Sequence, residues 1–217
     1  MTNRQPDLSS LAQKLEHELE LLEGSLRRLR LSWLLRHFPP RQIWAGFVCV
    51  NSFVAIALLS TVAMVSRSPF VFPSLGPTAY LLFFTPRAAA ASPKHAICGH
   101  AIGLACGWAA LWFSGLYHAP AVTAEGVNLT RVFAAAGSLG ATGALMVLCN
   151  VGHPPAGATT LIVSLGFITR IEYLLIIEAA VLALVLHALV MNRLSGIDYP
   201  LWSPRRHWAP LPRPPVD

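Results

Sequence analysis

Apolar residues gather along the chain into six stretches, which polar residues or prolines separate. A helix needs about 20 residues to cross a bilayer core of about 30 Å, because each residue adds about 1.5 Å. Four stretches reach or approach this length, whereas the second and the fifth have 16 residues each and carry proline and glycine near their starts. The pattern predicts membrane helices over residues 43–65, 70–85, 96–117, 132–150, 154–169 and 171–192.

The two short stretches share a sequence pattern. Segments 73–78 and 154–159 both place proline, glycine and threonine at their first, fourth and sixth positions, with a constant offset of 81 residues. Each lies between two full-length stretches, so the chain divides into two copies of a three-segment unit, over 43–117 and 131–192. Three is an odd number of crossings, so the second copy would run through the membrane in the opposite sense. We predict an all-α polytopic membrane protein of about six hydrophobic segments, built as two inverted three-segment repeats with two short broken helices.

The starts of the two short helices are the predicted substrate site, because short, proline-interrupted segments at corresponding positions of inverted repeats line such sites. Proline suits the first helical turn, and the backbone amides that follow it lack partners within the helix. Behind them lies roughly half a positive charge of helix dipole, which attracts a small anion. Glycine at this place lets the anion approach the backbone. The candidate substrate-binding residues are Gly76, Pro77, Thr78, His153, Pro154, Pro155, Ala156, Gly157, Ala158 and Thr159.

Two histidines are candidates for proton coupling. Protonation of His153, at the start of the second short helix, would couple anion binding to pH, whereas the alternative is a histidine that only caps the helix. His100 stands beside a line of small residues, Gly99, Gly103 and Gly107, which lets a second helix approach closely. This line favours a packed, hydrogen-bonded role for His100 over that of a cavity ligand.

Three further polar residues inside the spans are candidates for proton coupling or for lining the same cavity. A charge at the centre of a membrane helix costs about 2.5–3.5 kcal/mol, so Glu178 is a functional candidate by default. The alternatives are that Glu178 is protonated, or that it pairs with Arg170 or His100. Asn51 and Asn150 either line the cavity or bridge neighbouring helices.

Several of the small and hydroxyl-bearing residues have a structural alternative. Thr78 and Thr159 would then donate to carbonyls of their own helices, which is the commoner fate of a threonine in a membrane helix. Gly137, Gly140 and Gly143 indicate a packing surface on the fourth predicted helix.

Composition places the chain in the membrane, because 54% of its residues are hydrophobic and only 12% are charged. Of the 16 lysines and arginines, seven precede Ile43 and four follow Asn192, which predicts that both ends are cytoplasmic in a bacterial inner membrane. If both short stretches cross, the loops carry two cations inside and three outside. If both re-enter, the count becomes one and four, so crossing violates the positive-inside rule less. No basic stripe interleaved with aromatics indicates nucleic-acid binding.

The ends of the chain differ from the membrane portion. Residues 1–41 carry leucines at helical spacing between charged residues, which predicts a cytoplasmic amphipathic helix and juxtamembrane segment. Its polar face is mostly acidic over 14–23, which favours contact with the protein itself or a homo-oligomer over membrane lipid. Residues 193–217 form a cytoplasmic tail rich in proline and arginine.

Neither a cofactor nor a metal site is indicated by the side chains. The four cysteines lie in apolar stretches without a C-x-x-C pair, and the histidines share no ligand spacing. No G-x-S-x-G or H-E-x-x-H motif is present, so we expect no enzymatic activity. A metal-ion transporter that uses histidine and cysteine, and a non-transporting structural membrane protein, stay open as alternatives to an anion transporter.

One motif identifies a family. The stretch GHPPAGATTLI at 152–162 resembles the signature of the HPP family of integral membrane proteins, named for His153, Pro154 and Pro155. Further resemblances are SLGPTAYLLFFTP at 74–86, the Gly-His pair at 99–100 and YPLW at 199–202. The sequence departs from the expected Pro-Arg-Asn of the family at 93–95, where it has Pro-Lys-His.

The resemblance implies a function. It implies that residues 43–192 form a transmembrane HPP domain. Members in photosynthetic lineages are associated with nitrite transport, so the resemblance also implies that the domain acts as a transporter or channel. It also implies nitrite as the first substrate to consider among small inorganic anions.

Overall fold

The computed structural model describes residues 31–204, and every regular element in this range is a helix. The all-α class is therefore confirmed for the described residues. The amphipathic helix predicted over 1–41 lies mostly outside them, as does most of the predicted tail. The elements are α2 (Leu31–His37), α3 (Pro40–Ser66), α4 (Leu75–Phe84), the 3-10 helix η1 (Ala89–Ala91), α5 (Pro93–Phe113), α6 (Val122–Glu125), α7 (Leu129–Leu148), α8 (Pro155–Ser164) and α9 (Ile171–Leu194).

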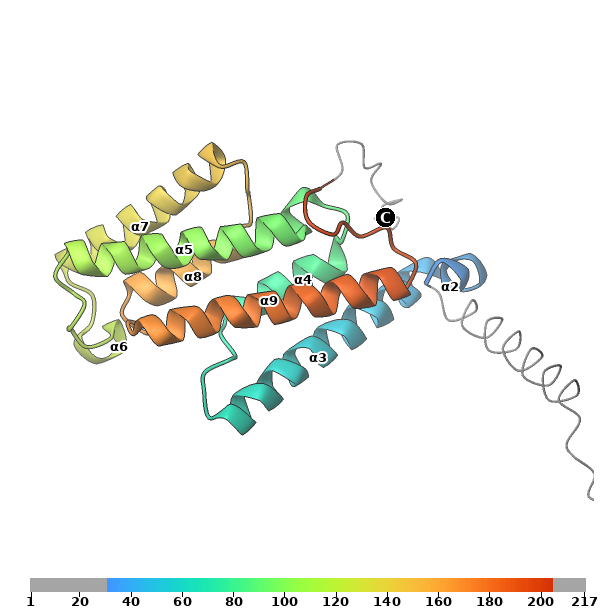
Figure 1. Cartoon of the computed structure of the whole chain (residues 1–217), viewed down its shortest axis with the longest axis horizontal. Coiled ribbons are helices and arrows are strands. Elements are labelled where there is room, and N and C mark those ends of the chain that lie inside the picture. Colours follow the sequence, from blue (N-terminus) through green and yellow to red (C-terminus); the bar gives the residue numbers. More distant parts are fainter. Residues whose placement is uncertain (1–30, 205–217) are drawn as a thin grey trace, which may run out of the picture.

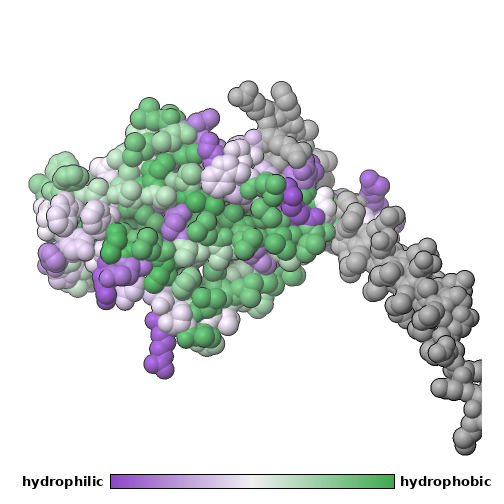
Figure 2. All heavy atoms as spheres, viewed as in Figure 1, coloured by the Kyte–Doolittle hydropathy of each residue, from purple (hydrophilic) through white to green (hydrophobic). Residues whose placement is uncertain are grey.

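Four helices are long and apolar enough to cross a membrane, namely α3, α5, α7 and α9. Their outward faces carry large apolar side chains, of which Phe53 and Val65 of α3 and Leu175 of α9 are each more than 60% exposed. Hydrophobic atoms dominate the middle of the face in Figure 2, and hydrophilic atoms lie mainly toward its ends. Such an extensive apolar surface is suited to lipid rather than to water. The chain is an integral membrane protein.

The two short helices, α4 and α8, have ten residues each. Ten residues rise about 15 Å, which is half the thickness of the hydrocarbon core. Figure 1 shows both helices starting near the middle of the long dimension and running to opposite ends. Non-helical segments, 67–74 and 149–154, lead inward from the ends of α3 and α7, which lie at the lower and upper edges of Figure 1, to the starts of α4 and α8. Each short stretch therefore consists of a non-helical segment followed by a helix that is long enough for about half of the core.

The chain leaves α3 and α7 through the same unusual backbone conformation. Arg67 directly follows α3 and Asn150 closely follows α7, and they are the two non-glycine residues with positive φ in the described chain, at 51° and 53°. A left-handed residue is a common way to end a helix and to turn the chain sharply. The sharp exits occur at corresponding places in the two halves of the sequence. The inverted relation between the two halves stays a prediction.

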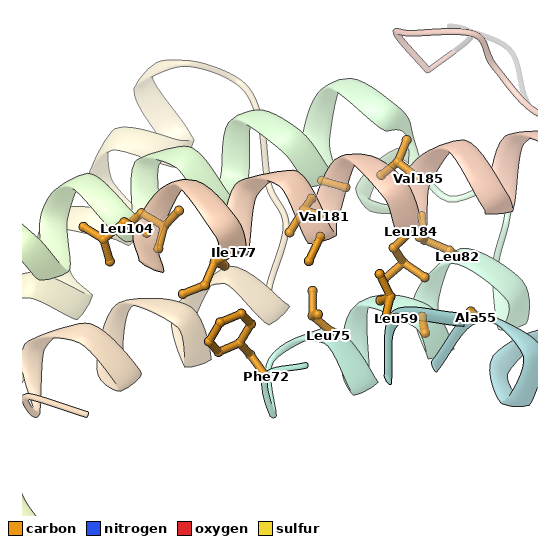
Figure 3. Close-up of a cluster of buried hydrophobic side chains, with 14 of the residues drawn as sticks. Ala55, Leu59, Phe72, Leu75, Leu82, Leu104, Ile177, Val181, Leu184 and Val185 are labelled. Carbon is orange, nitrogen blue, oxygen red and sulfur yellow. The ribbon is translucent and has the colours of Figure 1, made fainter. Parts of the chain in front are cut away.

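The core lies where the long helices pack around the half-helices. Leu75 and Leu82 of α4 and Ile177 and Leu184 of α9 are at most 1% exposed, and Figure 3 shows these side chains between the two helices. Phe72, from the non-helical segment before α4, is buried in the same cluster. The core thus fixes α4 and the segment that leads into it against a membrane-spanning helix.

The glycine line on α5 packs against α8, as the sequence predicts. A Cβ atom on Gly103 would lie 2.7 Å from the carbonyl oxygen of Ala156, and one on Gly107 would lie 2.7 Å from that of Thr160. Both distances are shorter than real contacts, so only glycine permits this approach. By contrast, a Cβ atom on Gly137, Gly140 or Gly143 of α7 would meet nothing within 4 Å, so the packing surface predicted there contacts nothing in the described chain.

The two described ends of the chain lie at the same end of the molecule. The amide of Leu31 donates to the carbonyl of Ser195 over 3.1 Å, and the amide of Lys94 donates to that of Trp202 over 3.0 Å. Residues 195–202, which we call the C-terminal strap, therefore pack beside the start of α5 (Figure 1).

At the opposite end, a buried arginine closes the loops. Arg131, at the start of α7, is 0% exposed. Its guanidinium donates to Glu125 over 3.0 Å, to the carbonyl of Leu165 over 3.3 Å, and to the carbonyl of Pro120. Leu165 is the C-cap residue of α8, so the arginine places a positive charge at the negative end of the α8 dipole.

Candidate functional site

Four polar side chains meet where the two half-helices begin. They are Thr78 of α4, His100 of α5, His153 in the segment before α8, and Thr159 of α8, and we call them the His–Thr cluster. All four are 0% exposed. Buried polar groups are costly unless they are hydrogen-bonded, so this cluster needs an internal network.

His100 joins the two half-helices. Its Nε2 lies 2.9 Å from Oγ1 of Thr78, and its Nδ1 lies 2.7 Å from Oγ1 of Thr159. These two threonines are the residues that the sequence places at matching positions of the two short stretches, 81 residues apart. One imidazole thus bridges the corresponding residues of α4 and α8, and the prediction of a packed, hydrogen-bonded His100 is confirmed.

His153 extends the network to η1. Its Nε2 lies 3.3 Å from Oγ1 of Thr78, its Nδ1 lies 2.7 Å from the carbonyl oxygen of Ala90, and its ring centre lies 5.0 Å from that of His100. A Cβ atom on Gly99 would lie 2.7 Å from Cβ of His153, so only glycine at 99 leaves room for this ring. The Gly-His pair at 99–100 therefore serves one site: the glycine admits one histidine and the next residue supplies the other.

The sequence misses several neighbours of the cluster. His95 lies with Nδ1 3.2 Å from the carbonyl of Gly152, directly before His153. Thr142 of α7 and Thr160 of α8 lie with their hydroxyl oxygens 2.9 Å apart. Ala90 contributes only its carbonyl, which no side-chain pattern can reveal. Thr142 and Thr160 are buried hydroxyl-bearing residues in apolar helices, and this is only a weak indication in the sequence that they belong near a polar site.

The backbone amides at the half-helix starts are not free, contrary to our expectation. The amides of Ala156 and Gly157 donate to the carbonyls of His153 and Pro154 over 3.0 Å each, and the amide of Gly76 donates to that of Pro73 over 3.3 Å. The chain closes tight turns at both starts, which uses these donors. The polar groups presented at these starts belong to side chains instead.

The remaining predicted residues of the short stretches differ in how far they are buried. Pro155 and Ala156 are buried and pack within the site, Gly157 is half-buried, and Gly76, Pro77, Pro154 and Ala158 are exposed on the outer surface. Thr78 also donates to the carbonyl of Ser74 over 3.0 Å, the within-helix bond that we considered as its alternative role. No such bond is recorded for Thr159, whose hydroxyl faces His100.

The other cavity candidates lie outside the cluster. The amide of Asn51 donates to the carbonyl of Phe47 in its own helix, and α3 packs on α4 and α9. Asn150 is exposed and serves as the left-handed residue after α7. Glu178 of α9 has both carboxyl oxygens buried and without a hydrogen-bond partner in the described chain. The expected pairing of Glu178 with Arg170 or His100 is therefore not present.

The C-terminal strap contacts the cluster through η1. The phenol of Tyr199, which is 0% exposed, donates to the carbonyl of Ala91, next to the Ala90 carbonyl that faces His153. Burial raises the pKa of this phenol, so it keeps its proton and stays a donor throughout the physiological pH range. The YPLW motif at 199–202 thus supports the site from outside.

Removal of the Tyr199 hydroxyl is expected to weaken the fold. Tyr199→Phe leaves the buried Ala91 carbonyl without its donor, so we expect a loss of about 1–2 kcal/mol in the free energy of unfolding. Thermal unfolding of the purified protein in detergent measures this loss, with Tyr80→Phe, at an exposed position, as the matched control. An equal change in the two variants would contradict the structural role of the phenol.

In chemical terms, the cluster offers hydroxyl and imidazole groups that both donate and accept hydrogen bonds. No carboxylate, lysine or arginine belongs to it, so any charge within it arises by protonation of a histidine. Within residues 31–204, no three His, Cys, Asp or Glu side chains gather as a group that could hold a metal ion.

Comparison with known proteins gives the family. Residues 37–200 match the family described as HPP, transmembrane region, which covers most of the chain and includes every residue of the His–Thr cluster. No curated protein and no solved structure matches the chain. The chain belongs to the HPP transmembrane family.

Proposed function

We propose that this protein passes a small inorganic anion across the membrane, with nitrite as the first substrate to test, and that the His–Thr cluster is its binding site. One observation carries the proposal: two half-helices enter from opposite ends and start at the same buried polar cluster. Broken helices at membrane depth are tolerated chiefly where they surround a site or a cavity.

The cluster suits an anion with few oxygen atoms. The hydroxyls of Thr78 and Thr159 and the N–H groups of the two histidines are the donors from which a bent two-oxygen ion would accept once it replaces their present partners. The partial positive charges at the starts of α4 and α8 point toward the same place, although their first amides already have partners. Side chains rather than free amides are therefore the binding elements in this proposal.

The distribution of charge supports a cytoplasmic location of both termini, in a bacterial inner membrane. The end that carries the termini holds Arg36, Arg41, Arg87, Lys94 and Arg193. The other three of the eight described lysines and arginines are Arg67, which follows α3, and Arg131 and Arg170 at the opposite end, which are each paired with a glutamate. A surplus of lysine and arginine marks the cytoplasmic side. Membrane lipid is then the main partner, and self-association through the predicted amino-terminal helix is a further proposal.

Anion flux into liposomes that contain the purified protein tests the proposal. We expect saturable entry of nitrite that exceeds entry of nitrate, formate, chloride or bicarbonate. We also expect a loss of at least about tenfold in His100→Leu, because this change removes the imidazole that bridges Thr78 of α4 and Thr159 of α8. His118→Gln, at an exposed position outside the cluster, is the control and should keep the flux.

Two results would contradict the proposal. The absence of flux for every anion, in protein shown to be folded and inserted, would remove the transport function. Flux that persists in folded His100→Leu would remove the cluster as the site while leaving transport standing. Folding is checked in each variant by size-exclusion chromatography in detergent.

A further inference from the structure

We infer that the His–Thr cluster takes up one proton with each anion, so that transport is electroneutral. This inference rests on the proposed function and adds its coupling. The arguments are the absence of fixed charge in the cluster and the pattern of its hydrogen bonds.

The groups that face the two histidines are almost all neutral. From α5, the titratable neighbours are His95 and His100, and His153 lies in the segment before α8 with its ring beside that of His100. From α4, α7, α8 and η1, the recorded contacts are with hydroxyls and carbonyls. The helix α9, which also packs on α5, carries Glu178, whose carboxyl makes no hydrogen bond in the described residues. The buried guanidinium of Arg131 is held by its own partners near the far end of α8.

A lone charge in this place is costly, whichever sign it has. An anion that enters a buried neutral cluster loses its hydration without gaining a counter-charge. A proton that binds a buried imidazole likewise creates a positive charge that has neither hydration nor a counter-charge. Each compensates for the other when both are present. Because the histidines are the groups in the cluster that can become positive, anion binding and histidine protonation occur together.

The hydrogen bonds define where the added proton goes. The Ala90 carbonyl only accepts, so Nδ1 of His153 must carry a hydrogen, and Nε2 of the neutral ring is bare. The Thr78 hydroxyl has one hydrogen, which it donates to the carbonyl of Ser74, so Nε2 of His153, 3.3 Å from its oxygen, receives no hydrogen from it. That hydroxyl oxygen in turn accepts from Nε2–H of His100. The Thr159 hydroxyl then donates to the bare Nδ1 of His100, so the neutral cluster is one chain of bonds with a single direction.

The free lone pair at Nε2 of His153 is therefore the proton acceptor. When it binds a proton, one N–H bond forms and no other covalent bond changes. The Thr78 hydroxyl keeps its bond to the carbonyl of Ser74, and its oxygen accepts from the new N–H of His153 as well. Thr78 thus stabilises the protonated ring of His153, and this ring is the positive charge beside which the anion binds.

Flux under imposed gradients tests the coupling. In liposomes that contain the full chain, we expect nitrite entry to rise about tenfold when the outside pH falls by one unit, as the proton concentration does. A potassium diffusion potential set with valinomycin should leave the rate unchanged. Protein-free liposomes give the background from permeation of nitrous acid, which is subtracted. Nitrite entry that follows the potential, or that is not accompanied by alkalinisation outside, would overturn electroneutral coupling.

Variants assign the acceptor. In His153→Gln the flux that remains should no longer depend on the pH gradient, while His118→Gln, outside the cluster, keeps the full dependence. Thr78→Val, which lacks the hydroxyl oxygen that accepts from protonated His153, should likewise reduce the dependence. Unaltered pH dependence in folded His153→Gln would overturn the assignment of the acceptor.

A measurement without transport separates the coupling from the proposed function. Nitrogen-15 spectra of labelled protein at neutral pH report which ring nitrogen carries the hydrogen. We expect the Nδ1–H form for His153 and the Nε2–H form for His100. The opposite form at either histidine would overturn the proton arrangement, even if nitrite is transported. If the spectra agree but no anion is transported, the proposed function fails and the coupling fails with it.

Discussion

Replacement of Gly103 with alanine is expected to lower the free energy of unfolding by about 2–3 kcal/mol, because the added methyl group overpacks the contact between α5 and α8. Its Cβ atom would lie 2.7 Å from the carbonyl oxygen of Ala156 and 2.9 Å from Oγ1 of Thr160. A backbone carbonyl in the first turn of a helix cannot move aside without moving the helix. The start of α8, and Thr159 with it, would therefore shift away from His100.

Gly140→Ala is the matched control for this substitution. Both glycines lie inside a long helix, and both gain about 1 kcal/mol of helix propensity from alanine, but nothing lies within 4 Å of a Cβ atom on Gly140. We expect Gly140→Ala to unfold at the same temperature as the parent protein or higher, and Gly103→Ala to unfold several degrees lower. Thermal unfolding in one detergent measures both. Equal stability of the two variants would show that α5 and α8 are not in close contact.

Arg131→Gln is expected to lower the free energy of unfolding by about 2–4 kcal/mol, because it removes a buried charge with three partners. The carbonyls of Pro120 and Leu165 lose their donor, and a glutamine is too short to replace both bonds. The end of α8 also loses the positive charge beside its last carbonyls. Thermal or denaturant unfolding in detergent measures the effect.

The second paired arginine of this end is the control. Arg170 forms a 3.3 Å bond with Glu172, but both side chains are at least 60% exposed. Exposed ion pairs contribute little, so Arg170→Gln should leave the unfolding temperature unchanged within error. If the two variants were equally destabilised, burial would not be the reason for the effect at Arg131.

The sequence predicts the framework of the fold because membrane helices are constrained by length and by backbone hydrogen bonding. The four long helices lie within a few residues of the predicted stretches, and the two short stretches contain ten-residue helices. The offset of 81 residues also locates Thr78 and Thr159 correctly as partners in one site, since both contact His100.

The details of the site could not be predicted for two physical reasons. The first is that amides near a proline at a helix start are available to a ligand only if the preceding turn does not bind them. Here the carbonyls of the turn at 153–157 accept from these amides. The second is that the Ala90 carbonyl depends on backbone position, which an alanine-rich segment does not encode in its side chains. Polarity alone makes Asn51 and Asn150 candidates either for lining the cavity or for bridging helices, because polarity does not specify the face of a helix.

The three-residue helix η1 has a consequence for communication across the protein. Two consecutive carbonyls of this one turn face different partners, with Ala90 bound by His153 in the centre and Ala91 bound by Tyr199 in the C-terminal strap. Thermodynamic reciprocity requires that any coupling between the two contacts act equally in both directions. An event that draws the strap away from η1 would change the proton affinity of the buried histidine, and occupation of the histidine would change how firmly the chain terminus is held.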